Sequence, residues 1–136
     1  MIHLTPEQRV FVLERHVATL TTLRPDGSPH VTPVAFTFDA DTGVAWLTSE
    51  VGAVKVRNVE AARAAGGPAI GALCQVAGGR WLTLEGTVTC SRDPDVVAEA
   101  ERRHLVRYGV PLEPDARRVA LHLAVTRVLG APYMTR

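Results

Sequence analysis

The segment from Thr48 to Asn58 carries the side chains best suited to binding a phosphate group. Thr48 and Ser49 end a predicted strand, and the chain continues into a predicted helix that contains Lys55 and Asn58. Hydroxyl groups and the free N–H groups of a first helical turn donate hydrogen bonds to anions, and the helix dipole favours negative charge there. Lys55 and Asn58 are three residues apart and share one helical face. The alternative is a plain strand end followed by a solvated lysine.

Lys55 is the single lysine in a chain with fourteen arginines. A bias that replaced lysine by arginine elsewhere would have replaced an idle surface lysine as well. The ammonium group is a compact point charge that can sit against one phosphate oxygen, whereas the guanidinium group is a broad planar fork. We therefore expect Lys55 to bind an anion.

Two further segments have the residue types to contact a planar ligand. Pro29 and Pro33 bracket the start of a predicted strand, so backbone groups between them are free of ladder pairing and can face a heteroaromatic ring. Arg80 and Trp81 follow a tight turn and can stack on a planar ligand or bind its anionic part. The simpler interpretations are an edge strand that Pro33 protects and a tryptophan that belongs to the core.

No motif indicates catalysis by side chains alone. The two cysteines lack metal-ligand spacing, the five histidines are scattered, and Walker, Rossmann and nucleophile-elbow motifs are absent from the sequence. We therefore predict no metal site and assign no catalytic side chain. His30 and Arg80 are candidates for orienting a substrate or delivering a proton. If the protein is an enzyme, a bound cofactor supplies its reactivity.

The elements that must position these residues follow from caps, turns and alternation. Three helices are predicted, at residues 6–15 after a Thr5 cap, at the alanine-rich residues 51–65, and at residues 94–108 after an Asp93 cap. Six strands are predicted at residues 17–23, 31–38, 44–48, 69–76, 80–90 and 117–129. Six antiparallel strands favour closure into a barrel, because closing removes exposed edges, and an open α+β sandwich is the alternative. We expect one domain over residues 1–136.

The composition limits the classes of binding partner and the cellular location that we expect. The net charge is +1 with both signs interspersed, which argues against nucleic acid and against an anionic membrane surface. No uncharged stretch is long enough to span a bilayer, and the N-terminus lacks a signal core, so we expect a cytoplasmic protein. A hairpin at Gly78 and Gly79 sets Cys74 opposite Thr83 and away from Cys90, so we expect both thiols to be reduced and buried.

In their order and spacing, these segments resemble the pyridoxamine-phosphate-oxidase-like split-barrel family, and within it the branch that uses the deazaflavin coenzyme F420. The resemblance rests on residues 18–22, 26–34, 55–59, 127–130 and the strand with Trp81, Glu85 and Gly86. Residues 73–76, 79–82 and 84–86 look most like the subgroup of F420-dependent biliverdin reductases.

The resemblance implies an α+β fold with a six-stranded antiparallel split β-barrel, a homodimer, and hydride transfer from reduced F420 to a small conjugated acceptor such as biliverdin. It implies that the cofactor ring lies along His30, Val31, Thr32, Pro33 and Val34, that the phosphate lies on Thr48, Lys55 and Asn58, and that Gln75, Arg80 and Trp81 reach the site from the second subunit.

One departure from the family pattern leaves the cofactor open. Some relatives carry an arginine two residues before the lysine, where this chain has Ala53. The alternatives are an FMN-dependent oxidase or reductase of the same fold, or a non-catalytic module that binds a flavin, haem or bilin.

Overall fold

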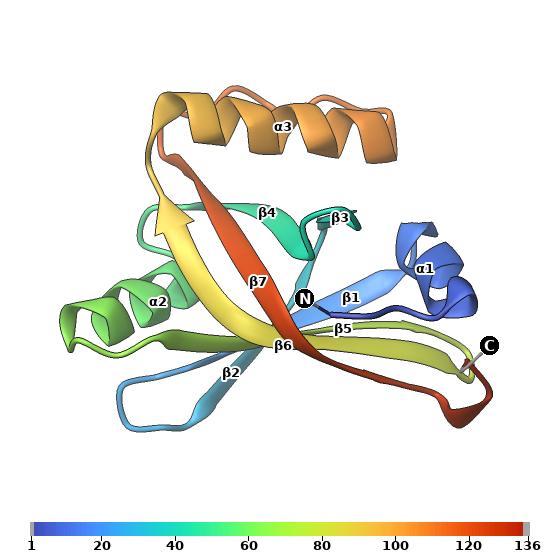
Figure 1. Ribbon diagram of the computed structural model, residues 1–136. Coiled ribbons are helices and arrows are strands. Elements are labelled where there is room, and N and C mark those ends of the chain that lie inside the picture. The colour runs from blue at the N-terminus through green and yellow to red at the C-terminus, as the bar shows by residue number, and fades with distance from the viewer. Residues whose placement is uncertain (1, 135–136) are drawn as a thin grey trace.

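Seven strands in one antiparallel sheet and three α-helices make up the computed structural model, which describes residues 2–134 (Figure 1). The helices are α1 (Pro6–Leu13), α2 (Val54–Ala64) and α3 (Pro94–Tyr108), and the strands are β1 (Val17–Leu23), β2 (Pro29–Val34), β3 (Thr37–Asp39), β4 (Val44–Glu50), β5 (Ala69–Ala77), β6 (Arg80–Ser91) and β7 (Arg118–Gly130), followed by the 3-10 turn η1 (Pro132–Met134).

The strand order explains how the sheet closes on itself. The order is β2-β1-β5-β6-β7-β4-β3, so β2 and β3 are the two outermost strands. Only Ala35 and Phe36 separate these two strands in the chain. Such a short connection holds the two sheet edges close together, which is how an antiparallel sheet becomes a split barrel. The predicted α+β split-barrel class is confirmed.

The number of strands differs from the prediction because residues 31–38 do not form one strand. β2 pairs with β1, and β3 pairs with β4. Between them, the hydroxyl of Tyr108 accepts a hydrogen bond from the Phe36 N–H at 3.2 Å and donates one to the Phe36 carbonyl at 3.0 Å. Because a side chain of α3 satisfies both backbone groups of Phe36, the strand ladder breaks there and the chain crosses to the opposite edge.

The capping residues define two of the helices as predicted. Thr5 and Gln8 form the reciprocal capping box of α1, and the Asp93 side chain accepts a hydrogen bond from the Asp95 N–H at the start of α3. α2 begins at Val54 rather than at residue 51. Gly52 has φ +95°, so the chain makes a turn there that a helix cannot include.

The barrel interior is filled by its own side chains. Leu20, Leu73, Leu84 and Leu123 are fully buried from four different strands. At the bulge between Glu85 and Gly86 the strands approach so closely that a Cβ atom on Gly86 would lie 1.9 Å from the Ala124 carbonyl oxygen. A ligand the size of a flavin therefore has to bind outside this core.

Cys74 lies opposite Thr83 in the β5–β6 hairpin, as predicted. Both Cys74 and Cys90 are free, and both are half-buried rather than buried. Cys74 lies on the outward side of β5, whereas Cys90 packs against the edge of the core near the end of β6. Within residues 2–134, none of the helices has the length and apolar character needed to cross a membrane.

Candidate functional site

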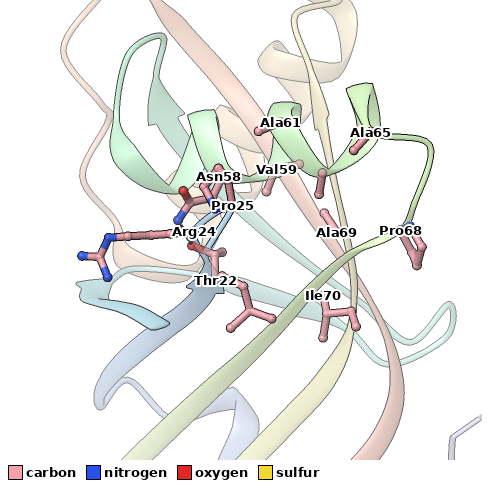
Figure 2. Close-up of a pocket in the computed structure, with 12 residues that line it drawn as sticks. Thr22, Arg24, Pro25, Asn58, Val59, Ala61, Ala65, Pro68, Ala69 and Ile70 are labelled. Carbon is pink, nitrogen blue, oxygen red and sulfur yellow. Dashed lines mark hydrogen bonds between the residues drawn. The ribbon is translucent and has the colours of Figure 1, made fainter. Parts of the chain in front are cut away.

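A groove runs along α2 where this helix packs beside the end of β1 (Figure 2). Two adjoining cavities, of about 240 Å³ and 340 Å³, form this α2 groove. Both cavities are lined by Arg24, Pro25, Asn58 and Ala61. Together they approach the size of small-ligand sites in proteins. The α2 groove is therefore the first candidate for the cofactor.

The polar wall of the α2 groove is built around Asn58. Asn58 is 6% exposed, and its Nδ2 donates a hydrogen bond to Thr22 Oγ1 at 3.0 Å, which ties α2 to β1. Thr22 in turn pairs with His30 across the β1–β2 ladder, so the two side chains share the inward face. His30 Nδ1 is buried and has no hydrogen-bond partner among residues 2–134.

The first turn of α2 is electropositive and open. Its N-cap, Ala53, provides no side-chain hydrogen bond, and the turn contains no acidic residue. Burial lowers the pKa of Lys55, and the nearby carboxylate of Glu50 acts in the opposite direction. A bound anion would satisfy the free N–H groups and lower the energetic cost of the half-buried ammonium group.

Two arginines line the α2 groove that the sequence did not identify as ligand contacts. Arg57 is exposed on α2, and Arg24 donates a hydrogen bond from Nη1 to the Pro29 carbonyl at 2.6 Å. Arg57 could have been found by its position two residues after Lys55. Arg24 has no comparable signal, because only the packing of α2 beside the β1–β2 turn brings it near Asn58.

Thr48 and Ser49 lie near the end of β4, where they pair with Ala120 and Val119 of β7. Thr48 lines a small recess beneath α3 together with His104, whereas Lys55 lines neither this recess nor the two cavities of the α2 groove. The structure therefore groups Asn58 with the α2 groove and sets Thr48 apart from it.

The side chains from His30 to Val34, which are predicted to lie along the cofactor ring, point alternately to the two faces of β2. His30, Thr32 and Val34 pair with the buried residues of β1 and share the inward face. Val31, which is 57% exposed, and the exposed Pro33 face outward. One face of this segment therefore belongs to the barrel and the other is open to a partner.

The β5–β6 hairpin lies at the other end of the sheet, near α1 (Figure 1). This hairpin carries Gln75, Arg80 and Trp81. Gln75 is 1% exposed, and its Nε2 donates to the Phe11 carbonyl at 2.8 Å. Arg80 pairs with a carboxylate oxygen of Glu14 at 3.2 Å. Gln75 is five positions along β5 from Ile70, which lines the α2 groove, and five strand rises span roughly 17 Å.

Within residues 2–134, no group of three or more histidine, cysteine, aspartate and glutamate side chains could hold a metal ion.

The chain is similar to known proteins over most of its length. The chain is 41% identical over 128 residues to the F420H2-dependent biliverdin reductase of Mycobacterium tuberculosis, which is 94% of this chain and 88% of the relative. A solved F420 reductase superposes with a TM-score of 0.69 at 28% identity, over 88% of this chain and 94% of the other.

A second solved structure shows the same fold at lower identity. It is a conserved hypothetical protein of Mycobacterium tuberculosis, 20% identical, which superposes with a TM-score of 0.76 over 96% of this chain and 86% of the other. Residues 4–130 match the family described as pyridoxamine 5'-phosphate oxidase. Because this match spans nearly the whole chain and the barrel has the corresponding fold, the chain belongs to the pyridoxamine 5'-phosphate oxidase family.

Proposed function

We propose that this protein is an F420H2-dependent reductase whose acceptor is a conjugated tetrapyrrole such as biliverdin. The observation that carries the proposal is the open, electropositive first turn of α2 beside the α2 groove, in a chain that is 41% identical to an F420H2-dependent biliverdin reductase. A cytoplasmic location is part of the same proposal.

The residues of the α2 groove fit a phosphorylated cofactor. Arg57 lines the groove and offers cationic hydrogen-bond donors. Lys55 lies in the adjoining first turn of α2 without lining either cavity, and the N–H groups of that turn are not capped by a side chain. Charge-assisted hydrogen bonds of this kind are the strong ones in phosphate recognition. In this proposal Lys55, Arg57 and Asn58 hold the phosphate and the segment from His30 to Val34 lies along the ring. Thr48 and Ser49, at the end of β4, lie outside the α2 groove and are not among the proposed contacts.

When bound, F420H2 supplies the hydride that reduces a conjugated double bond of the acceptor. The protein then has to bind and orient both molecules and to exclude water, and no side chain has to act as a nucleophile. His30 is the candidate proton donor of the proposed site, since its Nδ1 is buried without a partner among residues 2–134.

Exposed apolar side chains on the outward side of the sheet support a homodimer. Val31, Ile70 and Val76 are 57%, 57% and 44% exposed, and they point outward from β2 and β5. We define this outer face as the outward side chains of β2, β1, β5 and β6. Because the barrel interior is filled, a second copy on this outer face is what encloses a large tricyclic ring.

A twofold arrangement can join opposite ends of the two subunits. In an isologous contact through the outer face whose twofold axis is perpendicular to the line from α1 to α2, the α1 end of one subunit lies beside the α2 end of the other, and we propose this arrangement. Gln75, Arg80 and Trp81 belong to the α1 end. This supports the proposal that Arg80 and Trp81 complete the cofactor site of the second subunit. Gln75 is 1% exposed and its amide is bound within its own subunit, so the predicted contact of Gln75 with a second subunit does not fit this face.

The proposal is tested first by comparing the binding of two cofactors and then by measuring activity. F420 and FMN are titrated against the protein by fluorescence quenching, and oxidation of F420H2 is followed with biliverdin present. We expect F420 to bind more tightly than FMN and biliverdin to accelerate F420H2 oxidation. Tighter binding of FMN would support the FMN-dependent alternative, and binding of F420 without turnover of any acceptor would support a non-catalytic carrier.

A further inference from the structure

A second and larger cavity, of about 730 Å³, lies between the C-terminal end of α1 and the C-terminal half of α3. Its volume falls in the range of small-molecule sites. Four arginines line it, namely Arg15, Arg102, Arg103 and Arg107. We call this cavity the α1–α3 pocket. It adjoins Arg80 and Gln75, because Glu14 of its wall binds Arg80 and Arg107 of its wall binds Gln75.

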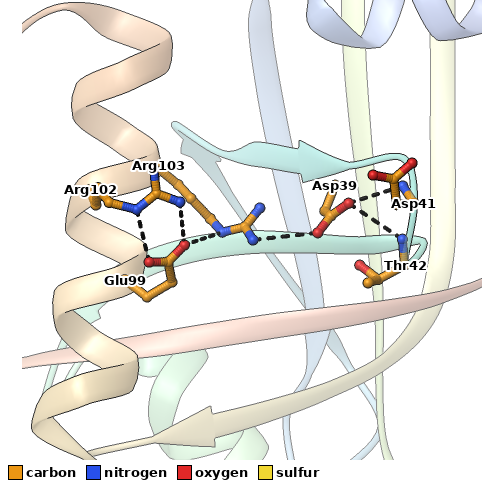
Figure 3. Close-up of polar contacts among 6 residues, drawn as sticks. All are labelled: Asp39, Asp41, Thr42, Glu99, Arg102 and Arg103. Atoms are coloured by element: carbon orange, nitrogen blue, oxygen red, sulfur yellow. Dashed lines mark hydrogen bonds and ion pairs between the residues drawn. The ribbon is translucent and has the colours of Figure 1, made fainter.

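Two of the four arginines are already neutralised by carboxylates (Figure 3). Arg102 forms a hydrogen bond from Nε to Glu99 Oε2 at 2.9 Å. Arg103 reaches Glu99 at 3.1 Å and Asp39 at 3.4 Å, and its guanidinium lies 4.5 Å from the centre of the Trp46 ring. These contacts fix the wall that α3 and β3 contribute to the α1–α3 pocket.

The other two arginines have no carboxylate partner among residues 2–134. Arg107 donates from Nη2 to the Glu14 carbonyl and to Gln75 Oε1, and its Nε and Nη1 atoms are buried without a hydrogen-bond partner. Burial lowers the pKa of Arg107, and the positive charge of the neighbouring Arg15 acts in the same direction. The carboxylate of Glu14 is already bound by His16 at 2.6 Å and by Arg80.

A hydroxyl group adds a third unsatisfied donor. Thr37 lines the α1–α3 pocket and is 8% exposed, and its Oγ1 has no hydrogen-bond partner among residues 2–134. A buried hydroxyl without a partner costs free energy, which a ligand that accepts its hydrogen bond would recover.

The remaining lining is apolar. Leu13 and Val106 line the pocket and are 57% and 73% exposed. A cationic wall beside an apolar one fits an apolar molecule that carries carboxylates, because the body covers the exposed apolar side chains while its acidic groups meet the arginines.

We propose that the α1–α3 pocket binds the carboxylate side chains of the acceptor, with Arg15, Arg107 and Thr37 as their hydrogen-bond donors. This inference rests on the proposed function in one respect, namely that the acceptor is a tetrapyrrole with propionate groups.

The test compares biliverdin with its dimethyl ester, which keeps the ring system and lacks the carboxylates. Dissociation constants are measured by visible absorbance for the F420-loaded protein and for the variants Arg15→Gln and Thr37→Val. Arg9→Gln is the matched control, because Arg9 is exposed on α1 and does not line the pocket. Thermal unfolding confirms that each variant is folded.

We expect the wild type to bind biliverdin at least tenfold more tightly than the diester. Arg15→Gln weakens biliverdin binding by about tenfold, as expected for loss of a charge-assisted hydrogen bond, and leaves diester binding unchanged. Arg9→Gln changes neither affinity. Equal affinities for acid and diester, or equal losses for both ligands in Arg15→Gln, would overturn the inference.

Turnover separates this inference from the proposed function. F420H2 oxidation with menadione, which has no carboxylate, reports on the reductase activity alone. If menadione is reduced and biliverdin does not bind, the pocket inference fails and the reductase stands. If biliverdin binds through its carboxylates and neither acceptor is reduced, the pocket inference stands and the proposed function fails.

Discussion

Lys55 is the residue on which phosphate binding depends most directly in this account. It lies half-buried in the first turn of α2, where burial lowers the pKa of its ammonium group. We predict that Lys55→Ala weakens F420 binding by about 1.5–3 kcal/mol, the contribution of a hydrogen bond to a charged group. Fluorescence titration measures this change.

Arg63→Ala provides the matched control, because Arg63 is exposed in the last turn of the same helix. It should leave F420 affinity unchanged. Neither substitution should lower the free energy of unfolding, and Lys55→Ala removes the cost of burying a charge. Unchanged F420 affinity in Lys55→Ala would show that the phosphate binds elsewhere.

At the scale of elements, an ion-pair chain joins α3 to β3. The hydrogen bond from Arg102 lowers the pKa of Glu99 from 4.5 to about 2, and the charges of Arg102 and Arg103 contribute. A carboxyl group with a lowered folded-state pKa stabilises the fold fully above its unfolded pKa, and this stabilisation is lost as the pH falls through the folded pKa. The relevant window therefore extends from about pH 4.5 down to about pH 2.

We predict that Glu99→Gln lowers the free energy of unfolding at pH 7 by about 0.5–1 kcal/mol, since water screens this ion pair. The difference from the wild type should shrink as the pH falls from 4.5 towards 2. Urea unfolding at a series of pH values measures it. Glu113→Gln, an exposed change in the loop after α3, is the control. A difference that is constant with pH would exclude the ion pair as its cause.

Some helices and strands are determined by residues close together in the sequence, and others are not. Thr5 and Asp93 allowed α1 and α3 to be predicted closely, because caps and turns act over a few residues. The break at Phe36 could not be predicted, because its cause is the hydroxyl of Tyr108, 72 residues away in the chain.

The residues of the candidate site also differ in whether the local sequence predicts them. Lys55 and Asn58 could be chosen from their position at the start of a helix. The partner of Asn58 is Thr22, 36 residues earlier, and Arg24 joins the α2 groove only through packing of the helix on β1. Long-range contacts of this kind leave no local pattern in the sequence.

At the scale of the whole molecule, we predict a homodimer through the outer face. Light scattering at micromolar concentration should give twice the 14.7 kDa mass of the chain. Val76→Arg should shift the protein towards monomer and weaken F420 binding at least tenfold, since a charge at this 44% exposed position opposes apolar burial and the site needs both subunits.

Val110→Arg is the control for the dimer, because Val110 is 63% exposed and lies after α3, away from the outer face. It should remain dimeric with unchanged F420 affinity. A monomeric wild type that binds F420 with full affinity would contradict the shared site.

Deuterium labelling tests directly whether the hydride passes from F420H2 to biliverdin on this protein. F420H2 labelled with deuterium at its donor carbon is mixed with the protein and biliverdin in ordinary water, and the product is examined by mass spectrometry. We predict one deuterium in each molecule of reduced product, because the acceptor is held against the cofactor and receives the hydride directly. Reduced product that contains only hydrogen from water, or F420H2 that is not oxidised although F420 and biliverdin both bind, would contradict it.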